Sequence, residues 1–345
     1  MSGGVDSAVC AYLIKKSGSS AEGVTMRLWG CNSDTDTYDT APDINCIDAK
    51  ETANALGIPH RCIALGHSFK KNVVDKFISE YINGLTPNPC VECNKKIKFG
   101  ALMEYAEAQG FDALATGHYA RIAADENGEY LLKKAADEKK DQSYFLWSIK
   151  KEYLKKIILP LGELTKAQVR EIADKENLPC AKRADSQDVC FIPDGDYAEF
   201  IRENSPLGFP KGNFIDCSGK VLGEHQGIIN YTVGQRKGLG IALGHPIFVK
   251  SKCVENNTVT LCENEELFSD FLTAHSINIL KNGALDAPIR VEAKIRYRHE
   301  PSPALAWIEN DKLHVRFDTP QRAITSGQSV VLYQGDTLIC GGIIE

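Results

Sequence analysis

Residues 2–7 of the chain, Ser-Gly-Gly-Val-Asp-Ser, have the composition of a loop that binds a polyphosphate. The two glycines let the backbone run close to phosphate groups and turn its amides toward them. The apolar-rich residues 8–16 that follow predict a helix, and the unpaired N–H groups and dipole at its start attract anions. Ser2 and Ser7 can add hydroxyl contacts, and Asp6 can hold the magnesium ion that accompanies a bound nucleotide.

The loop lacks the Gly-Lys-Ser/Thr ending of a Walker loop, which argues against kinase or GTPase chemistry. The pattern SGGxDS instead resembles the loop of enzymes that split ATP into AMP and pyrophosphate in order to activate a carbonyl oxygen. A glycine-rich turn that only caps a helix is the alternative interpretation. In an open α/β sheet such a loop follows a buried strand, and only Met1 precedes it here. We therefore expect the first strand of the sheet to be missing.

The chain of 345 residues is long enough for two or three domains. Its first part alternates predicted strands (23–28, 60–65, 113–116) with predicted helices (49–56, 70–81, 99–109, 153–158, 166–176), which is typical of a parallel sheet covered by helices. Four later segments with alternating polarity (289–297, 304–309, 312–317, 329–334) predict a small β-barrel. We expect an α/β ATP-pyrophosphatase domain over residues 1–205, a small central domain over 206–268 and a C-terminal β-barrel over 269–345.

Composition excludes several classes of protein. The sequence shows neither a run of about 20 apolar residues nor a signal peptide, so we expect a cytoplasmic protein without a membrane partner, or one of an organelle matrix. Twelve cysteines without a secretory signal predict reduced thiols. A net charge of −6 argues against a protein that coats nucleic acid non-specifically, but it leaves room for a folded RNA bound at local basic patches.

The segment Thr86-Pro87-Asn88-Pro89-Cys90-Val91-Glu92-Cys93-Asn94 is a second candidate for chemistry. Prolines on both sides of Asn88 predict a rigid, extended loop that presents Cys90 and Cys93 to a cleft. Three lysines follow within five residues of Cys93, and positive charge stabilises a thiolate. A nucleophilic thiol fits this pattern better than a redox pair or a zinc site, since neither a second C-x-x-C nor an H-x₃-H pair supplies further metal ligands. Two incidental buried thiols are the remaining alternative.

Cys190, within Asp185-Ser186-Gln187-Asp188-Val189-Cys190-Phe191, lies between polar and apolar residues, as at the edge of a pocket. Alone it is equally compatible with a structural role. Distant cysteines combined with an ATP-activating loop indicate sulfur handling, in which one thiol carries a persulfide and the other resolves the bond to it.

The chain contains, in this order, SGGVDS, TPNPCVECNKKIKF, ATGHYAR, KDQSYFL, DSQDVCF, NYTVGQRKGLG and IRYRHEP. Together these segments resemble the tRNA-specific 2-thiouridylases. The resemblance implies that ATP adenylates O2 of the wobble uridine of certain tRNAs, that pyrophosphate leaves, and that a cysteine persulfide delivers sulfur to C2. It also implies that the anticodon stem-loop is bound, that a cysteine desulfurase or sulfur-relay protein donates the sulfur, and that the protein is a monomer.

The resemblance assigns roles to single residues. It implies that Cys93 is the nucleophile and Cys190 the persulfide carrier, with a disulfide bond as part of the chemistry. The positions matched to ATP contacts are Ser2, Gly3, Gly4, Val5, Asp6, Ser7, Met26 and Gly117. Those matched to the target base are Asn88, Pro89 and Cys90. Those matched to other tRNA contacts are His118, Lys140, Asp141, Gln142, Arg296, Tyr297 and Gln328. Some relatives carry an acidic residue at the position of Cys90, which leaves the general acid or base open.

Two other functions remain alternatives at this point. One is a different ATP-pyrophosphatase, which would not be expected to carry NPCVECN and DSQDVCF in this order. The other is a non-catalytic RNA-binding protein that has lost its nucleotide site with the first strand. Release of pyrophosphate from ATP would separate the enzymes from the binding protein.

Overall fold

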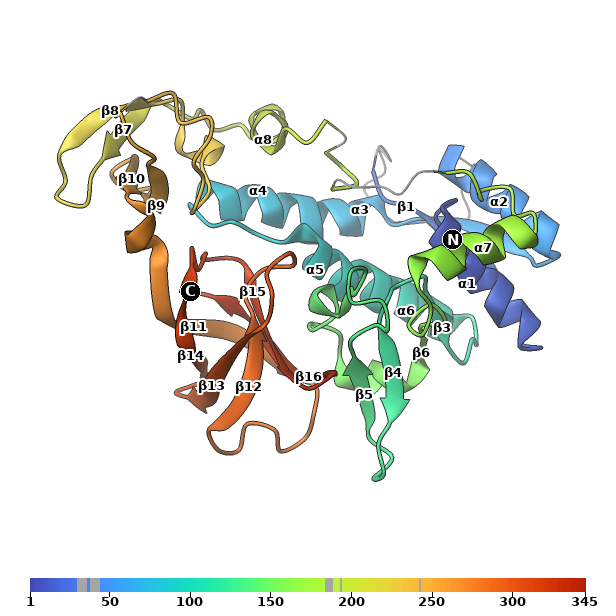
Figure 1. Ribbon diagram of the computed structural model, residues 1–345. Helices are drawn as coiled ribbons and strands as arrows, with labels where there is room; N and C mark the ends of the chain where they lie inside the picture. Colours follow the sequence, from blue (N-terminus) through green and yellow to red (C-terminus); the bar gives the residue numbers. More distant parts are fainter. Residues whose placement is uncertain (30–35, 38–43, 184–188, 193, 242) are drawn as a thin grey trace.

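The computed structural model describes residues 1–29, 36–37, 44–183, 189–192, 194–241 and 243–345. Three regions follow one another along the chain, and the ribbon in Figure 1 separates the α/β region around α1 from the β-barrel at the C-terminus. No helix in these ranges is long and apolar enough to cross a membrane.

The N-terminal region has the predicted α/β architecture. Strand β1 (Gly23–Arg27) pairs in parallel with β2 (His60–Ala64), and β3 (Leu114–Ala115) pairs in parallel with β6 (Ile157–Ile158). The flanking helices include α1 (Val5–Lys16), α2 (Ile44–Leu56) and α7 (Lys166–Lys175). The prediction of a helix over 153–158 is wrong at its end, because the β-branched side chains of Ile157 and Ile158 join the sheet and only Lys151–Lys156 form a 3₁₀-helix.

Two long helical stretches cross the middle of this region, and each contains a π-helical segment. The first is α3 (Gly66–Phe69), a π-helix over Lys70–Val74, and α4 (Asp75–Ile82). The second is α5 (Pro89–Cys93), a π-helix over Asn94–Ala101, and α6 (Leu102–Ala108). Sequence patterns predicted only the later parts of both. π-Helical turns are rare and often lie at functional sites, and the second one directly follows Cys93.

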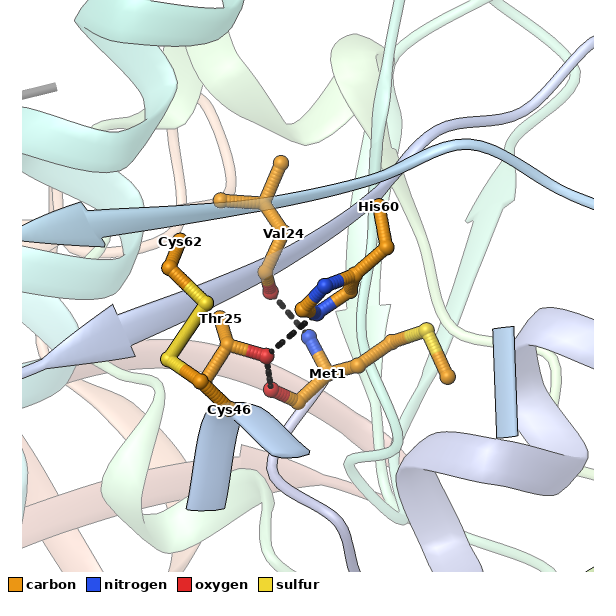
Figure 2. Close-up of a disulfide and its surroundings, with 6 residues drawn as sticks. All are labelled: Met1, Val24, Thr25, Cys46, His60 and Cys62. Carbon is orange, nitrogen blue, oxygen red and sulfur yellow. Dashed lines mark hydrogen bonds between the residues drawn. A yellow bond between two sulfur atoms is a disulfide. The ribbon is translucent and has the colours of Figure 1, made fainter. Parts of the chain in front are cut away.

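Met1 lies beside β1. Its ammonium group donates to the Val24 carbonyl, and its own carbonyl accepts a hydrogen bond of 2.7 Å from Thr25 Oγ1 (Figure 2). Burial lowers the pKa of this ammonium to about 6. Within residues 1–29 no strand precedes α1, which begins after the loop that contains Gly3 and Gly4.

A disulfide joins Cys46 on α2 to Cys62 on β2 (Figure 2). The expectation that all thiols are reduced is therefore wrong for this pair. The cause is tertiary, since α2 packs on β2 and brings together two thiols that are 16 residues apart in sequence. The other described cysteines are free.

The central region is a four-stranded sheet with the order β8-β7-β10-β9. Its elements are α8 (Tyr197–Asn204), β7 (Gly212–Ile215), β8 (Val221–His225), β9 (Phe248–Cys253) and β10 (Thr258–Cys262). Phe214 and Val259 from this sheet share one hydrophobic core with Phe77 of α4 and Ile97 of the second π-helix. The central sheet is therefore packed directly on the helices that surround Cys93.

The C-terminal region is the predicted barrel. Its strands are β11 (Phe268–Ile279), β12 (Ile289–Lys294), β13 (Ser302–Glu309), β14 (Lys312–Arg322), β15 (Ser329–Gln334) and β16 (Thr337–Ile344). β11 pairs with both β14 and β16, which closes the barrel. The hairpin of β4 (Arg121–Ala124) and β5 (Tyr130–Lys133) extends this sheet at β16 through the pair Thr337 and Lys133 (Figure 1).

The N-terminal region and the barrel also share a hydrophobic core. Trp147 is 1% exposed, its indole N–H donates to Ser329 Oγ at 2.9 Å, and it packs on Gly341 so closely that a Cβ there would lie 2.6 Å from the ring. Tyr144 donates to the Ser329 carbonyl at 2.9 Å. The barrel is thus packed directly against the N-terminal region, which carries the glycine-rich loop and the cysteine segments.

Candidate active site

The loop of residues 2–7 is closed by its own side chains. Ser2 N–H donates to Ser7 Oγ at 3.1 Å, and Ser7 Oγ donates to the Gly4 carbonyl at 2.9 Å. Gly3 has φ of 75°, a conformation that favours glycine. Helix α1 begins at Val5 without a side-chain cap, so the backbone N–H groups at its start remain available to an anion. The geometry confirms the predicted arrangement of loop and helix.

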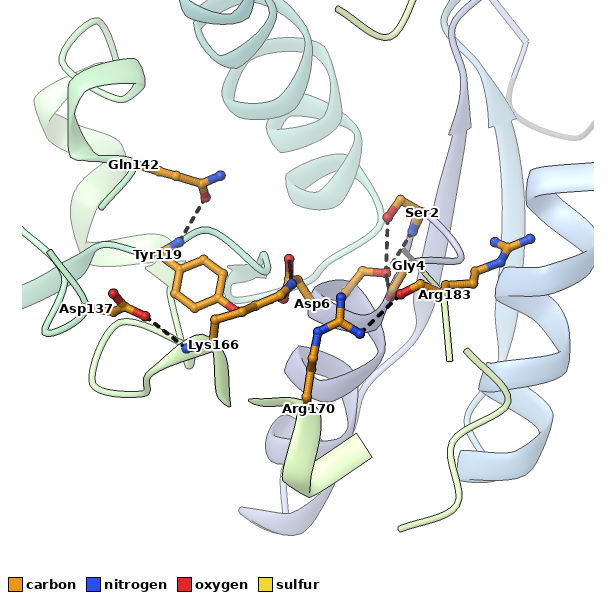
Figure 3. A network of polar contacts seen from close by, with 10 residues as sticks. Ser2, Gly4, Asp6, Tyr119, Asp137, Gln142, Lys166, Arg170 and Arg183 are labelled. Atoms are coloured by element: carbon orange, nitrogen blue, oxygen red, sulfur yellow. Dashed lines mark hydrogen bonds and ion pairs between the residues drawn. The ribbon is translucent and has the colours of Figure 1, made fainter. Parts of the chain in front are cut away.

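Asp6 points from this loop toward side chains far along the chain (Figure 3). Lys166 Nζ lies 2.8 and 2.9 Å from its two carboxylate oxygens, and Tyr119 OH donates to one of them at 2.7 Å. Lys166 and Tyr119 therefore occupy most of the acceptor sites of this carboxylate, and a magnesium ion would have to share it with them or displace Lys166. In the part of the chain that the structure describes, no group of three or more His, Cys, Asp or Glu side chains could hold a metal ion.

Gly117 and His118 connect the loop to the cysteines. A Cβ on Gly117 would lie 2.8 Å from the backbone of Asp6, so this position touches the loop and has no room for a side chain. The next residue, His118, has Nδ1 2.8 Å from Thr116 Oγ1 and Nε2 3.3 Å from Lys98 Nζ. Met26, on β1, packs against the core shared with the central sheet.

The turn before Cys90 is held by an N-cap and by the barrel. Asn88 Oδ1 accepts the Cys90 N–H at 3.2 Å and caps α5, which has a proline at its first position. Gln328 Nε2 donates to the Thr86 carbonyl at 2.7 Å, and the Thr86 N–H donates to the Ser326 carbonyl at 3.0 Å. The prediction of an extended loop is therefore wrong for the two cysteines: the chain is extended at Asn88, but Pro89 at the first helical position and the Asn88 cap start α5, which carries both Cys90 and Cys93. The part before the helix is held from the barrel side.

The structure brings the three candidate thiols together. Cys90 and Cys190 lie close enough to Cys93 that a negative charge on either would raise its pKa. Lys98 lies close enough to all three thiols for its ammonium to lower their pKa. Cys93 is buried, whereas Cys90 and Cys190 are exposed. Lys98 follows Cys93 by five residues, and the π-helix over Asn94–Ala101, whose hydrogen bonds join residues five apart, returns it to the side of the thiols.

Burial decides the protonation of these thiols. Burial raises the pKa of Cys93 to about 12. The surrounding chain also desolvates the thiols of Cys90 and Cys190, although these residues reach the surface, and raises their pKa; the charge of Lys98 opposes all three shifts. Burial and Lys98 also hold the pKa of His118 well below its usual range. Lys98 does favour the thiolate form of each cysteine, as the basic run suggests, but desolvation outweighs this single cation.

The rate of Cys93 alkylation by iodoacetamide is expected to rise about tenfold per pH unit from pH 6 to pH 9, with no plateau, because only the thiolate reacts. A Lys98→Met variant should react more slowly at each pH, and Lys96→Met, an exposed lysine of the same run, should match the wild type. Mass spectrometry of the peptide that contains Cys93 measures the rate. Alkylation of the urea-unfolded chain, which should begin to level off near the ordinary thiol pKa of about 8.5, is the control, and a similar levelling off in the folded protein would contradict the prediction.

Sequence comparisons match all three regions. Residues 1–194 match the family described as tRNA methyl transferase HUP domain, residues 199–263 the tRNA methyl transferase PRC-barrel domain, and residues 269–344 the aminomethyltransferase beta-barrel domain. The chain is 46% identical over its full length to the tRNA-specific 2-thiouridylase MnmA of Clostridioides difficile, of which it covers 96%, and 46% identical to that of Acetivibrio thermocellus, of which it covers 98%. It belongs to the tRNA-specific 2-thiouridylase family.

Several residues that the resemblance matched to tRNA contacts also hold this thiouridylase together. Asp141 accepts hydrogen bonds from the N–H groups of Ala135 and Ser143, and Gln142 accepts the Tyr119 N–H at 3.0 Å, while Lys140 lies in the preceding turn. Arg296 donates to the Val233 and Ala323 carbonyls, which joins the connection between β8 and β9 of the central region to the barrel. Tyr297 packs on Phe145 with ring centroids 4.3 Å apart.

Sequence reasoning missed the partners of the thiouridylase loop. Lys166, Tyr119 and Arg183 contact residues 2–7 but lie more than a hundred positions away. The sequence held a signal for two of them, since Tyr119 is part of ATGHYAR and Lys166 is the first residue of a predicted helix.

The segment that precedes Cys190 includes residues 184–188, which lie outside the described ranges, so the structure places Cys190 but not the first residues of its motif.

Proposed function

We propose that this protein adenylates the wobble uridine of tRNA with ATP and replaces its O2 with sulfur carried by Cys190, with Cys93 as the resolving nucleophile. Family membership supports ATP-dependent 2-thiouridylase activity on tRNA. The observation that carries the residue assignments is the pair Gly117 and His118, because Gly117 touches the loop and His118 contacts Lys98, the lysine whose charge acts on Cys93. Nucleotide activation and sulfur chemistry can therefore take place at one site.

The proposed reaction has three covalent steps. Uracil O2 attacks the α-phosphorus of ATP, and the bond from that phosphorus to the β-phosphate oxygen breaks, so pyrophosphate leaves. The terminal sulfur of the Cys190 persulfide attacks C2, and the C2–O2 bond breaks, so the oxygen leaves with AMP. Cys93 then attacks Sγ of Cys190 and breaks its bond to the transferred sulfur, which leaves 2-thiouridine and a Cys93–Cys190 disulfide. A dithiol reductant must restore both thiols before the next turnover.

The environment of each thiol supports its proposed task. Cys190 is exposed and can receive sulfur from a persulfide donor such as a cysteine desulfurase or a sulfur-relay protein. Cys93 is buried with a raised pKa, so it stays protonated and unreactive until a bound substrate changes its surroundings. The anticodon loop is single-stranded, which lowers the cost of moving the target base out of its stack. Asn88, Pro89 and Cys90 form the turn that is proposed to contact that base.

Three further points belong to the same proposal. Magnesium enters with the ATP phosphates and takes Asp6 as a ligand. The protein acts as a monomer on one tRNA. Arg296, Tyr297 and Gln328 contact tRNA with the parts of their side chains that the internal contacts leave exposed.

Pyrophosphate release from ATP tests the proposal. Release is expected to require an unmodified tRNA with uridine at the wobble position and to be absent with a matched tRNA that carries cytidine there. With a persulfide donor present, mass spectrometry of the nucleosides should show 2-thiouridine. Release without any tRNA would favour a different ATP-pyrophosphatase, and tRNA binding without release would favour a non-catalytic RNA-binding protein.

A further inference from the structure

Two cations from a distant part of the chain lie on the phosphate loop. Lys166, the first residue of α7, pairs with Asp6 (Figure 3). Arg183, in the turns after α7, donates through Nη1 to the Gly3 carbonyl at 3.0 Å. They are 160 and 180 positions from their partners in sequence. The loop motif itself contains no Lys or Arg, so its positive charge is supplied from outside.

Lys166 is held in place from several directions. Its side chain is only 12% exposed, whereas that of Asp6 is 36% exposed. Its backbone N–H donates to Asp137 Oδ2 at 3.0 Å, and the capping box of Thr165 and Gln168 fixes the start of α7. Its ammonium also lies 5.9 Å from the centre of the Tyr119 ring. Because a buried ammonium without a counter-charge is costly, Asp6 serves as its partner while the loop holds no phosphate.

Arg183 lies at the other end of the loop. Besides its bond to Gly3, its guanidinium pairs with Asp48 of α2. Arg170 of α7 donates to the Arg183 carbonyl at 3.2 Å, which ties this turn to the same helix that carries Lys166. A guanidinium offers five donors in a plane, more than these contacts use, and its geometry suits phosphate oxygens.

Among the described residues, the loop motif and the start of α1 supply little positive charge to a bound triphosphate without these two cations. The start of α1 contributes roughly half a positive charge. Asp6 contributes a full negative charge that repels the ligand. Charge-assisted hydrogen bonds from Lys and Arg are the strong contacts that phosphate oxygens make in proteins.

We propose that Lys166 and Arg183 bind the β- and γ-phosphates of ATP, and that Lys166 transfers from Asp6 to these phosphates as ATP binds, which frees the Asp6 carboxylate for magnesium. This inference rests on the ATP-dependent function proposed above. The same two side chains then hold the pyrophosphate product, so they bind the half of the nucleotide that leaves first.

Affinities for AMP and for an ATP analogue with a non-hydrolysable α,β bridge, measured by calorimetry, test the first part. Lys166→Met and Arg183→Met are each expected to weaken analogue binding about 10- to 100-fold and to leave AMP binding unchanged within about twofold, because AMP lacks the phosphates they contact. Lys166→Arg should restore most of the loss. Lys175→Met and Lys182→Met, exposed lysines near the same helix and turn, are the matched controls and should bind like the wild type.

Equal losses for AMP and the analogue would mean that the two residues only support the fold, and no loss for either would also overturn the proposal. A wild-type protein that binds neither nucleotide would instead contradict the ATP-dependent function. These measurements need no tRNA, so a failure of the sulfur chemistry cannot be mistaken for a failure of the phosphate site.

Asp6→Asn tests the exchange of partners. Without magnesium this variant is expected to bind the analogue several-fold more tightly than the wild type, because Lys166 no longer has a carboxylate to leave. With magnesium it should bind several-fold more weakly, because the ion loses a ligand. Weaker binding under both conditions would show that Lys166 does not move between the two partners.

Discussion

Replacing Cys190 with serine is expected to abolish formation of 2-thiouridine while pyrophosphate release from ATP continues. Serine cannot carry a persulfide, so no sulfur reaches C2, but the loop of residues 2–7 and its partners are untouched. Thiolation should fall by at least about a thousandfold, the size of loss seen when a nucleophile is removed from a group that acts as a unit. Nucleoside mass spectrometry and a pyrophosphate assay on the same reaction measure the two steps separately.

Cys93→Ser should fail differently, which makes it the informative companion. Sulfur can still attach to the base, but no thiol resolves the bond to Cys190, so tRNA is expected to remain covalently attached to the protein through a reducible bond. Cys217 is an exposed free cysteine in the turn between β7 and β8, so Cys217→Ser is the matched control and should thiolate normally. Normal thiolation by either Cys93→Ser or Cys190→Ser would exclude the proposed division of roles.

Trp147→Ala is expected to lower the free energy of unfolding by about 3–5 kcal/mol, the usual cost of truncating a fully buried large aromatic side chain. Trp147 is 1% exposed and fills the core that the N-terminal region shares with the barrel. The substitution also leaves Ser329 Oγ without its indole donor. Urea unfolding followed by far-UV circular dichroism measures the loss.

Two further variants separate the causes of that loss. Trp147→Phe keeps most of the side-chain volume but removes the indole N–H that Ser329 Oγ accepts. The lost hydrogen bond should lower the free energy of unfolding by about 1–2 kcal/mol beyond the effect of the smaller ring. Trp307→Ala removes a half-exposed aromatic ring from the outer surface of the barrel and should cost much less. A loss from Trp147→Ala no larger than that from Trp307→Ala would mean that the two regions do not depend on a common core.

The sequence alone predicted the parts of this enzyme whose meaning is local. The glycine-rich loop of residues 2–7 and the helix after it are neighbours in the chain, so their arrangement could be predicted locally. The prolines around Asn88 likewise indicated a constrained segment before Cys90 and Cys93, although not the helix that carries them. Strands β1, β2 and β15 were predicted to within a residue, because their periodicity and turn signals are continuous.

Only the tertiary structure decided the electrostatics of the site. The lysines after Cys93 favour thiolates, but the folded chain buries Cys93 and desolvates its two neighbours, and Lys98 is the lysine of that run whose charge acts on all three thiols. The position of Lys98 depends on the π-helix over Asn94–Ala101, which the sequence pattern did not predict. The Cys46–Cys62 disulfide, the Asp6–Lys166 pair and the Trp147 core were equally invisible in the sequence. The two residues of each of these contacts lie between 16 and 182 positions apart in the sequence. Only the packing of the folded chain brings such residues together, whereas a sequence motif is made of neighbouring residues.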